Sequence, residues 1–287
     1  MRKWTIDHGV QLNVDSLAPR RAAVLGSPVG HSRSPDLHLA AYRALGLADW
    51  RYDRMECTAE DLPGLVGSAG PEFVGFSVTM PAKKAALAFA DERTERADLV
   101  GSANTLVRTG NGWRADCTDI DGIAGALREL DVDASRNGAA VMVGAGGTAL
   151  PAVAALSDAG FTELAVVARD ETRAAPVLAL ARRLGMTTSL LPFEDGPELA
   201  AHSRAAEVLV STVPADGAAV LADSLAGAPR VIDVIYHPWP TPLAAAVSAA
   251  GGRVVGGLVM LLNQAYSQVE QFTGLPAPKN AMAAALR

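Results

Sequence analysis

Two adjacent lysines stand at a point of the chain where α/β proteins often bind ligands. Lys83 and Lys84 follow the apolar run 73–80 and Pro81, which places them at the end of a predicted strand and the start of a helix. Open α/β sheets bind ligands at that edge. Most lysines are solvated surface residues, and this pair could be the same. A cation at a helix N-terminus is mildly unfavourable, however, so some other interaction could be the reason that one of these lysines stands there.

Asp119 and two serines also occupy turns between predicted elements. Asp119 lies between a predicted hairpin and a helix, where it or Thr118 could simply cap the helix. Ser32 and Ser34 bracket a strand-to-helix turn, and their hydroxyls could bind a carboxylate. Capping explains Ser34 equally well and leaves Ser32 unexplained.

A glycine-rich turn in the middle of the chain has the features of a phosphate-binding loop. It follows the apolar run 139–143 and precedes a helical pattern, and it consists of Gly144, Ala145, Gly146, Gly147, Thr148 and Ala149. Strand, turn and helix in this order fit the dinucleotide fingerprint G-x-G-x-x-G/A. The glycines permit a tight turn and a close approach of backbone N–H groups to a pyrophosphate. The helix N-terminus adds partial positive charge.

Apolar runs separated by turn signals predict an α/β protein. Before the glycine turn we expect strands over 22–26, 51–56, 73–80, 103–108 and 113–115, and helices over 34–45, 82–89 and 119–130. After it, helical patterns alternate with strands expected over 164–168, 187–191, 208–211, 230–235 and 253–255. This alternation predicts a parallel, doubly wound sheet with helices on both faces.

Charge and composition bear on partners and location. The chain has 287 residues and a formal net charge of −6, which argues against nucleic acid or an anionic membrane as partner but not against a small anionic substrate. No apolar stretch approaches the roughly 18 residues of a membrane span, and the first residues do not resemble a signal peptide. Cys57 and Cys117 suit a reducing cytoplasm. His31 and His38 lack metal-ligand spacing, so we expect no metal site.

Seven motifs, in order along the chain from about residue 22 to the C-terminus, resemble those of the shikimate dehydrogenase family. They are G-S-P-V-G-H-S-R-S-P at 26–35 with His38, S-V-T-M-P-A-K at 77–83, S-A-N-T at 102–105, C-T-D at 117–119, G-A-G-G at 144–147, Tyr236 with T-P-L at 241–243, and M-L-L-N-Q at 260–264.

The resemblance implies a fold and a reaction. The fold is an N-terminal α/β substrate domain plus a Rossmann-type nucleotide-binding domain, with C-terminal helices returning to the first domain. We expect a flexible extension over 1–20, a substrate-binding catalytic domain over 21–120 with about 258–287, and a dinucleotide-binding domain over 121–257. The implied reaction is reversible NADP(H)-dependent reduction of 3-dehydroshikimate to shikimate, in the route to aromatic amino acids.

The resemblance also implies roles for individual residues. Lys83 would be the general acid/base and Asp119 its partner, while Lys84 would be solvated. Burial would lower the pKa of Lys83 and Asp119 would raise it, so the sequence does not decide the net direction. The residues expected to bind the substrate carboxylate are Ser32, Ser34 and Tyr236. Those expected to bind the ring hydroxyls are Thr79, Asn104, Asp119 and Gln264. The cofactor would contact the glycine turn (Gly144, Ala145, Gly146, Gly147, Thr148) and Glu95, Gly257 and Met260.

Three departures from the family pattern bear on specificity. Ser77 and Cys117 stand where the family usually has Asn; Ser77 could weaken or relocate a substrate hydrogen bond, and we expect activity to survive at Cys117. Arg169 and Arg173 could clamp a 2′-phosphate, which favours NADP. Asp170 could instead bind a free ribose hydroxyl, so NAD remains open.

The sequence leaves two alternative functions open. The enzyme could act on a related ring, as a quinate or aminoshikimate dehydrogenase. A catalytically inactive sensor of dinucleotide and metabolite is the remote alternative, and the presence of both Lys83 and Asp119 argues against it. We expect a cytoplasmic monomer or homodimer whose partner is the small-molecule substrate, with no nucleic acid and no membrane.

Overall fold

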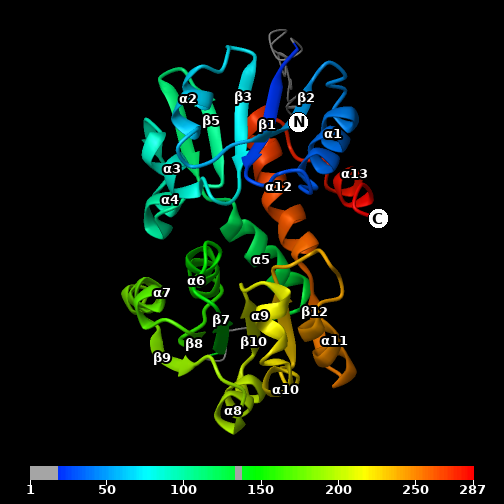
Figure 1. The fold of residues 1–287 in the computed structure, drawn as a ribbon. Helices are drawn as coiled ribbons and strands as arrows, with labels where there is room; N and C mark the ends of the chain where they lie inside the picture. The colour runs from blue at the N-terminus through cyan, green and yellow to red at the C-terminus, as the bar shows by residue number, and fades with distance from the viewer. Residues whose placement is uncertain (1–18, 133–137) are drawn as a thin grey trace, which may run out of the picture.

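The protein folds into two α/β halves, each built on a six-stranded sheet. The computed structural model describes residues 19–132 and 138–287, so the extension expected over residues 1–20 lies almost wholly outside the described residues. One sheet lies above the other in Figure 1, with long helices passing between them. The predicted fold class is confirmed.

The first sheet has the strand order β2-β1-β3-β5-β6-β4. Its strands are β1 (Arg21–Gly26), β2 (Arg51–Glu56), β3 (Phe73–Val78), β4 (Glu92–Arg93), β5 (Thr105–Thr109) and β6 (Gly112–Asp116). β5 runs antiparallel to both neighbours, and the other pairs are parallel. β5 and β6 form the hairpin predicted at residues 109–112. Along β1, Val24 packs on one face and Leu25 on the other, because helices cover both faces of the sheet.

Helices cover the two faces of the first sheet. One face packs against α1 (Ser34–Ala44) and α12 (Gly257–Thr273), with α13 (Lys279–Ala284) lying against both helices. The other carries α2 (Leu62–Gly67), α3 (Lys83–Phe89) and α4 (Glu95–Val100). The C-terminal helices thus return to the first sheet, as predicted.

The second sheet is entirely parallel, with the order β12-β11-β10-β7-β8-β9. Its strands are β7 (Ala139–Val143), β8 (Glu163–Ala168), β9 (Thr187–Pro192), β10 (Val208–Ser211), β11 (Arg230–Asp233) and β12 (Arg253–Val255). Its helices are α6 (Ala149–Asp158), α7 (Glu171–Arg183), α8 (Pro197–Ala205), α9 (Ala215–Ala219), α10 (Ala222–Leu225) and α11 (Pro242–Ala249). The chain enters at the central strand β7, winds outward to β9, and then returns to build the other half. This is the doubly wound order of dinucleotide-binding sheets, whose ligand crevice lies where the winding reverses.

Two helices that pack closely against each other join the halves. α5 (Asp119–Glu129) leads out of the first sheet, and α12 leads back to it (Figure 1). A Cβ atom at Gly122 would stand 2.7 Å from the side chain of Met260, and one at Gly125 would stand 2.0 Å from that of Asn263. Glycine costs conformational entropy inside a helix, but here it permits an approach that no larger residue allows. None of the helices in the described residues is long and apolar enough to cross a membrane.

Candidate active site

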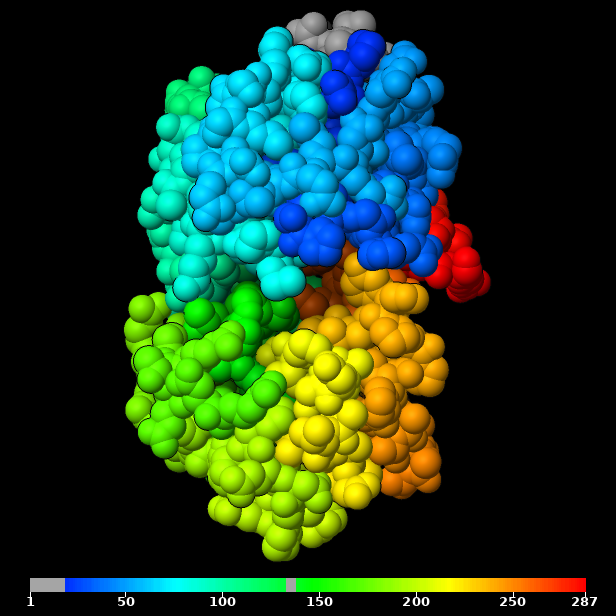
Figure 2. Space-filling view, viewed as in Figure 1, coloured from blue at the N-terminus to red at the C-terminus, as the bar shows by residue number. Residues whose placement is uncertain are grey.

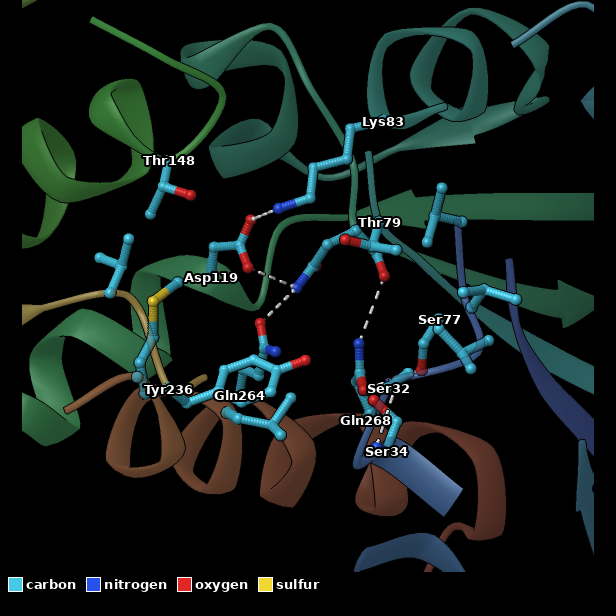
Figure 3. Close-up of a pocket in the computed structure, with 18 of the residues that line it drawn as sticks. Ser32, Ser34, Ser77, Thr79, Lys83, Asp119, Thr148, Tyr236, Gln264 and Gln268 are labelled. Carbon is cyan, nitrogen blue, oxygen red and sulfur yellow. Dashed lines mark hydrogen bonds and ion pairs between the residues drawn. The ribbon is translucent and has the colours of Figure 1, made fainter. Parts of the chain in front are cut away.

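Both sheets present their carboxyl edges to one cleft. The first sheet contributes the segments after β1 and β3, and the second contributes those after β7, β11 and β12. Figure 2 shows the molecule hollowed between its halves, and Figure 3 shows the side chains that line the cleft. The structure gathers there these predicted residues: Ser32, Ser34, Thr79, Lys83, Asn104, Asp119, Thr148, Tyr236, Gly257, Met260 and Gln264.

Lys83 and Asp119 face each other in this cleft (Figure 3). Lys83 Nζ donates to Asp119 Oδ2 at 2.6 Å, and the two side chains are 19% and 2% exposed. Thr118 stands at the N-cap of α5 without a side-chain capping bond, and Asp119 is the first helical residue. The capping alternative for both is therefore wrong. The ion pair with Asp119 explains why a lysine stands at the start of α3. Its neighbour Lys84 is exposed.

The structure gives the direction that the sequence left open for Lys83. Burial alone would lower the pKa of Lys83, but the charge and the hydrogen bond of Asp119 outweigh burial and raise the pKa above its usual value. Lys83 is therefore an ammonium at neutral pH. Burial and the nearby Asp119 raise the pKa of the Cys117 thiol to about 12, so this thiol stays neutral beside the pair.

Asn104 links the ion pair to α12. Its Nδ2 donates to Asp119 Oδ1 and to Gln264 Oε1, each at 3.0 Å. Its Oδ1 accepts from the backbone N–H of Thr118 at 2.7 Å. β3 ends at Val78 instead of continuing to residue 80 as predicted, and Thr79 lies beyond the strand, at the cleft. These groups offer donors and acceptors suited to a polyol.

Two serine hydroxyls lie together at the other end of the cleft. The prediction that Ser34 could cap α1 is wrong, because the helix begins at Ser34 itself and no side chain caps it. Instead, Ser32 Oγ accepts from the backbone N–H of Ser34 at 3.3 Å. Arg54 fixes the turn from β2, since its Nε and Nη2 donate to the carbonyl oxygen of Ser32 at 2.9 and 2.6 Å.

Tyr236 reaches the same end of the cleft from the second sheet, just beyond β11. Burial raises the pKa of its phenol, and the charges of Arg33 and Arg54 oppose this only in part. The phenol therefore remains a donor at neutral pH. Hydroxyls from both halves, with arginines nearby, form a site suited to a carboxylate.

A second pocket lies at the glycine turn after β7. Its lining includes the predicted Gly144, Ala145, Gly146, Arg169 and Arg173. Gly144 has a φ of +101°, and a Cβ there would stand 2.5 Å from Val213. Glycine is therefore required at this turn.

The charged residues after β8 make different contacts. Asp170 caps α7, where its Oδ1 accepts from the N–H groups of Thr172 at 2.8 Å and Arg173 at 3.2 Å. Its Oδ1 is thereby engaged in the cap, while Asp170 itself borders the pocket. The Arg169 guanidinium lies 4.9 Å from the centre of the Phe193 ring. Arg169 and Arg173 both border the pocket.

Two predicted cofactor residues lie outside the lining of both pockets. Glu95 is exposed at the start of α4, and Gly147 lies in the glycine turn, where a Cβ atom would have no protein atom within 4 Å. Sequence reasoning also missed lining residues. Gln268 lies one helical turn beyond Gln264, so an i, i+4 pattern could have revealed it. Phe193 directly follows a parallel strand, where ligand groups gather.

Comparisons with known proteins identify the family of the chain. The chain matches the family models for the shikimate dehydrogenase substrate binding domain over residues 24–106 and the shikimate 5′-dehydrogenase C-terminal domain over residues 257–287. The shikimate dehydrogenase (NADP(+)) of Halobacterium salinarum is 39% identical, and the match covers 92% of this chain and 97% of that protein.

Solved structures show the same likeness. The crystal structure of Mycobacterium tuberculosis shikimate dehydrogenase is 61% identical, with a TM-score of 0.88 over 93% of this chain and 99% of that one. Thermus thermophilus shikimate 5-dehydrogenase in complex with NADP(H) and shikimate is 30% identical, with a TM-score of 0.77 over 93% and 98%. Because such relatives match over nearly its whole length, the chain belongs to the shikimate dehydrogenase family.

Proposed function

We propose that the protein catalyses the reversible NADPH-dependent reduction of 3-dehydroshikimate to shikimate in aromatic amino acid biosynthesis. The observation that carries this proposal is the ion pair of Lys83 and Asp119 at 2.6 Å, set in a cleft with hydroxyls at one end and a glycine turn nearby. The name of the Halobacterium relative and the ligands of the Thermus complex support the substrate and cofactor.

Different polar groups of the cleft would bind different parts of the substrate. Ser32, Ser34 and Tyr236 would bind its carboxylate, and the groups around Asn104 would bind its ring hydroxyls, namely Thr79, Asp119 and Gln264. Buried donors and acceptors of this kind discriminate strongly, because an analogue that lacks a hydroxyl leaves them unpaired.

Lys83 moves the proton of the reaction. In the reduction, its ammonium donates a proton to the carbonyl oxygen of the substrate and stabilises the negative charge that develops there. In the oxidation, the neutral amine takes the proton back from the hydroxyl. Asp119 holds Lys83 in place and favours the protonated form. When bound, NADP(H) supplies or accepts the hydride.

The residues of the second pocket fit this cofactor. At Gly147 a Cβ would meet no protein atom within 4 Å, so its backbone is open to a phosphate. The turn residues Gly144, Ala145, Gly146, Gly147 and Thr148 would hold the pyrophosphate at the N-terminus of α6. Arg169 and Arg173 would bind the 2′-phosphate, and Gly257 and Met260 would face the nicotinamide. Glu95, a cofactor residue implied by the family resemblance, stays a prediction.

The domain division and the setting are part of the proposal. Residues 21–120 with 258–287 would form the substrate-binding catalytic domain, and residues 121–257 the dinucleotide-binding domain. We propose a cytoplasmic monomer or homodimer. The two cysteines are free and buried, which suits a reducing compartment.

A steady-state assay tests the function directly. Shikimate, quinate and aminoshikimate are each tested against NADP and NAD. We expect kcat/KM to be highest for shikimate with NADP. A higher kcat/KM for quinate or aminoshikimate would identify that compound as the preferred substrate, and a higher kcat/KM with NAD would identify NAD as the preferred cofactor. Binding of shikimate and NADP without turnover of any of the three would indicate the sensor.

A further inference from the structure

A buried tyrosine stands behind the substrate-facing side chains without lining the cleft itself. Tyr52 of β2 is 4% exposed, and its hydroxyl donates to Ser77 Oγ at 2.6 Å. Ser77 Oγ in turn donates to Gln268 Oε1 at 2.8 Å. Ser77 and Gln268 both line the cleft. The tyrosine therefore reaches the substrate site through the residue that replaces the family's usual Asn.

A backbone group fixes the direction of these hydrogen bonds. Gln268 Nε2 lies 3.3 Å from the carbonyl oxygen of Asn104, which can only accept. Gln268 Oε1 must then face Ser77, so the single hydroxyl hydrogen of Ser77 is committed to Gln268. Tyr52 must be the donor to Ser77. Burial raises the pKa of Tyr52 well above its usual value, so this hydrogen is retained at neutral pH.

The same chain of hydrogen bonds continues to the catalytic pair. Gln268 Nε2 donates to Thr105 Oγ1 at 3.0 Å, and Thr105 Oγ1 donates to Asn104 Oδ1 at 3.0 Å. The backbone N–H of Thr118 independently fixes the orientation of the Asn104 amide. Asn104 Nδ2 then donates to Asp119. Each bond points toward the carboxylate, which strengthens a chain cooperatively.

The surroundings hold the Tyr52 ring rigidly. The His38 ring stacks on it with centroids 4.0 Å apart. Burial lowers the pKa of His38 to about 3, so this histidine is neutral. Its Nε2 lies 3.3 Å from Gln268 Oε1, an acceptor, and therefore carries the hydrogen. Loss of the Tyr52 hydroxyl alone would leave this packing in place.

We propose that Tyr52 is a positioning residue for substrate specificity, acting through Ser77. Its hydrogen bond keeps the Ser77 hydroxyl turned toward Gln268, so that Ser77 offers the substrate an acceptor. An amide at this position would also offer a donor. Ser77 thus selects a ring hydroxyl that donates, and Gln268 and Asn104 keep the orientation that the ring requires. This inference rests on the proposed function.

A double-mutant cycle tests the link. Tyr52→Phe removes one hydroxyl, and we expect it to raise KM for shikimate about 5-fold, the usual worth of one hydrogen bond, while kcat and KM for NADP stay within about twofold. Ser77→Ala should have a similar effect. Because both changes break the same chain, adding Tyr52→Phe to Ser77→Ala should raise KM no further.

Tyr42→Phe is the matched control. Tyr42 is 1% exposed and packs in the same aromatic cluster, but within the described residues its hydroxyl has no partner. We expect unchanged KM and kcat. Melting temperatures of all variants report on folding. If Tyr52→Phe folds poorly, the KM of Ser77→Ala for shikimate still tests whether the hydrogen bonds of Ser77 contribute to substrate binding.

Three outcomes would overturn the inference. One is an unchanged KM in Tyr52→Phe. Another is an additive rise in the double variant, which would make Tyr52 merely structural. The third is a wild-type protein that does not turn over shikimate, which would overturn the proposed function as well. If the wild type turns over shikimate and the KM of Tyr52→Phe is unchanged, only the inference about Tyr52 is overturned.

Discussion

Asp116 and Asp119 lie on one short segment and are equally buried, at 3% and 2% exposed, yet their partners differ in kind. Asp116 accepts hydrogen bonds from the side chains of Arg96, Thr94 and Gln271 and from the N–H of Cys117. Burial would raise its pKa, but chiefly Arg96 outweighs that effect and lowers it. Its oxygens are saturated, and it does not line the cleft.

Asp119 has fewer partners, and one of them can release a proton. It binds Lys83 and Asn104 and borders the cleft. Arginine stays charged in proteins, whereas a lysine pKa responds to its surroundings. Burial and residue type therefore do not separate a carboxylate that only stabilises the fold from the one proposed to act with Lys83. The chemistry of the partner and access to the cleft do.

The largest expected effect tests the catalytic side of the comparison. Lys83→Ala should lower kcat by about two orders of magnitude or more, because the variant lacks the proposed general acid/base. Lys84→Ala, the neighbouring exposed lysine, should change kcat little. Steady-state kinetics on both variants measures this. Equal losses in the two variants would refute the assignment of Lys83.

The raised pKa of Lys83 gives a pH dependence with a definite sign. With Lys83 as the proposed base, oxidation of shikimate uses the neutral amine, so its kcat should rise with pH into the alkaline range, beyond the ordinary lysine pKa of about 10.4. Reduction needs the ammonium and should fall over the same range. Rate profiles in both directions measure this, and a plateau of the oxidation below pH 8 would assign the proton to another group.

The comparison extends to arginines. Arg96 is enclosed by carboxylates, whereas Arg169 and Arg173 border an open pocket. Replacing Arg169 and Arg173 together by Gln should lower kcat/KM with NADP about 30-fold, since charge-assisted hydrogen bonds are lost, and change the value with NAD about twofold. Arg183→Gln, an exposed change on the same helix, is the control. Equal losses with both cofactors would contradict a role in binding the 2′-phosphate.

Arg96→Met tests the structural side of the comparison. It leaves Asp116 buried without its cation and should lower the free energy of unfolding by about 2 kcal/mol, less than for a fully buried pair because Arg96 is partly exposed. Arg93→Met removes an exposed pair with Asp98 and should cost about 0.5 kcal/mol or less. Denaturant titrations measure both.

The pH dependence of that loss has its own sign. The lowered pKa of Asp116 contributes stability above the ordinary carboxyl pKa of about 3.9, and this contribution is lost as pH falls through the folded-state pKa. The difference between wild type and Arg96→Met should therefore shrink in acid. A difference that is constant from pH 7 to pH 3 would show that Arg96 acts by packing alone.

Cys117 lies between the two aspartates in the sequence, and its replacement should have the least effect. Cys117→Ala removes a buried neutral thiol and should leave kcat within about twofold, with a stability cost of about 1 kcal/mol. Assay and thermal melting check this. A tenfold fall in kcat would mean that the thiol takes part in setting the ion pair.

The sequence predicted much of the fold because its signals are local. Apolar runs located most strands to within a residue or two, such as β1, predicted at 22–26 and found at 21–26, and β8, predicted at 164–168 and found at 163–168. Parallel strands of one sheet place their carboxyl ends along one edge, so residues near 34 and 79 could be expected to meet. Tyr236 follows a strand of the second sheet, and only the family resemblance linked it to them. The motif resemblance supplied the roles.

Partners across the fold were out of reach of such signals. Asp119 looks like a helix cap in its own segment. The family resemblance implied its pairing with Lys83, 36 residues earlier, and the structure supplies the distance of 2.6 Å between them. The direction of the Lys83 pKa depends on the same unseen distance. Tyr52 gives no sign in the sequence of its place behind Ser77, because strand alternation marks it simply as a buried residue.

The late position of α12 has a consequence for biosynthesis. This helix brings Met260, Gln264 and Gln268 to a cleft whose other groups come largely from the first sheet, and its Phe272 packs against Gly75 of β3. The N-terminal part of a protein is synthesised first, so the part of this face that α12 covers stays open, beside α1, while the second half of the molecule is made. A nascent chain halted before residue 257 would hold its lysine and aspartate but no closed pocket. Competence to react therefore arrives all at once, with the final helices.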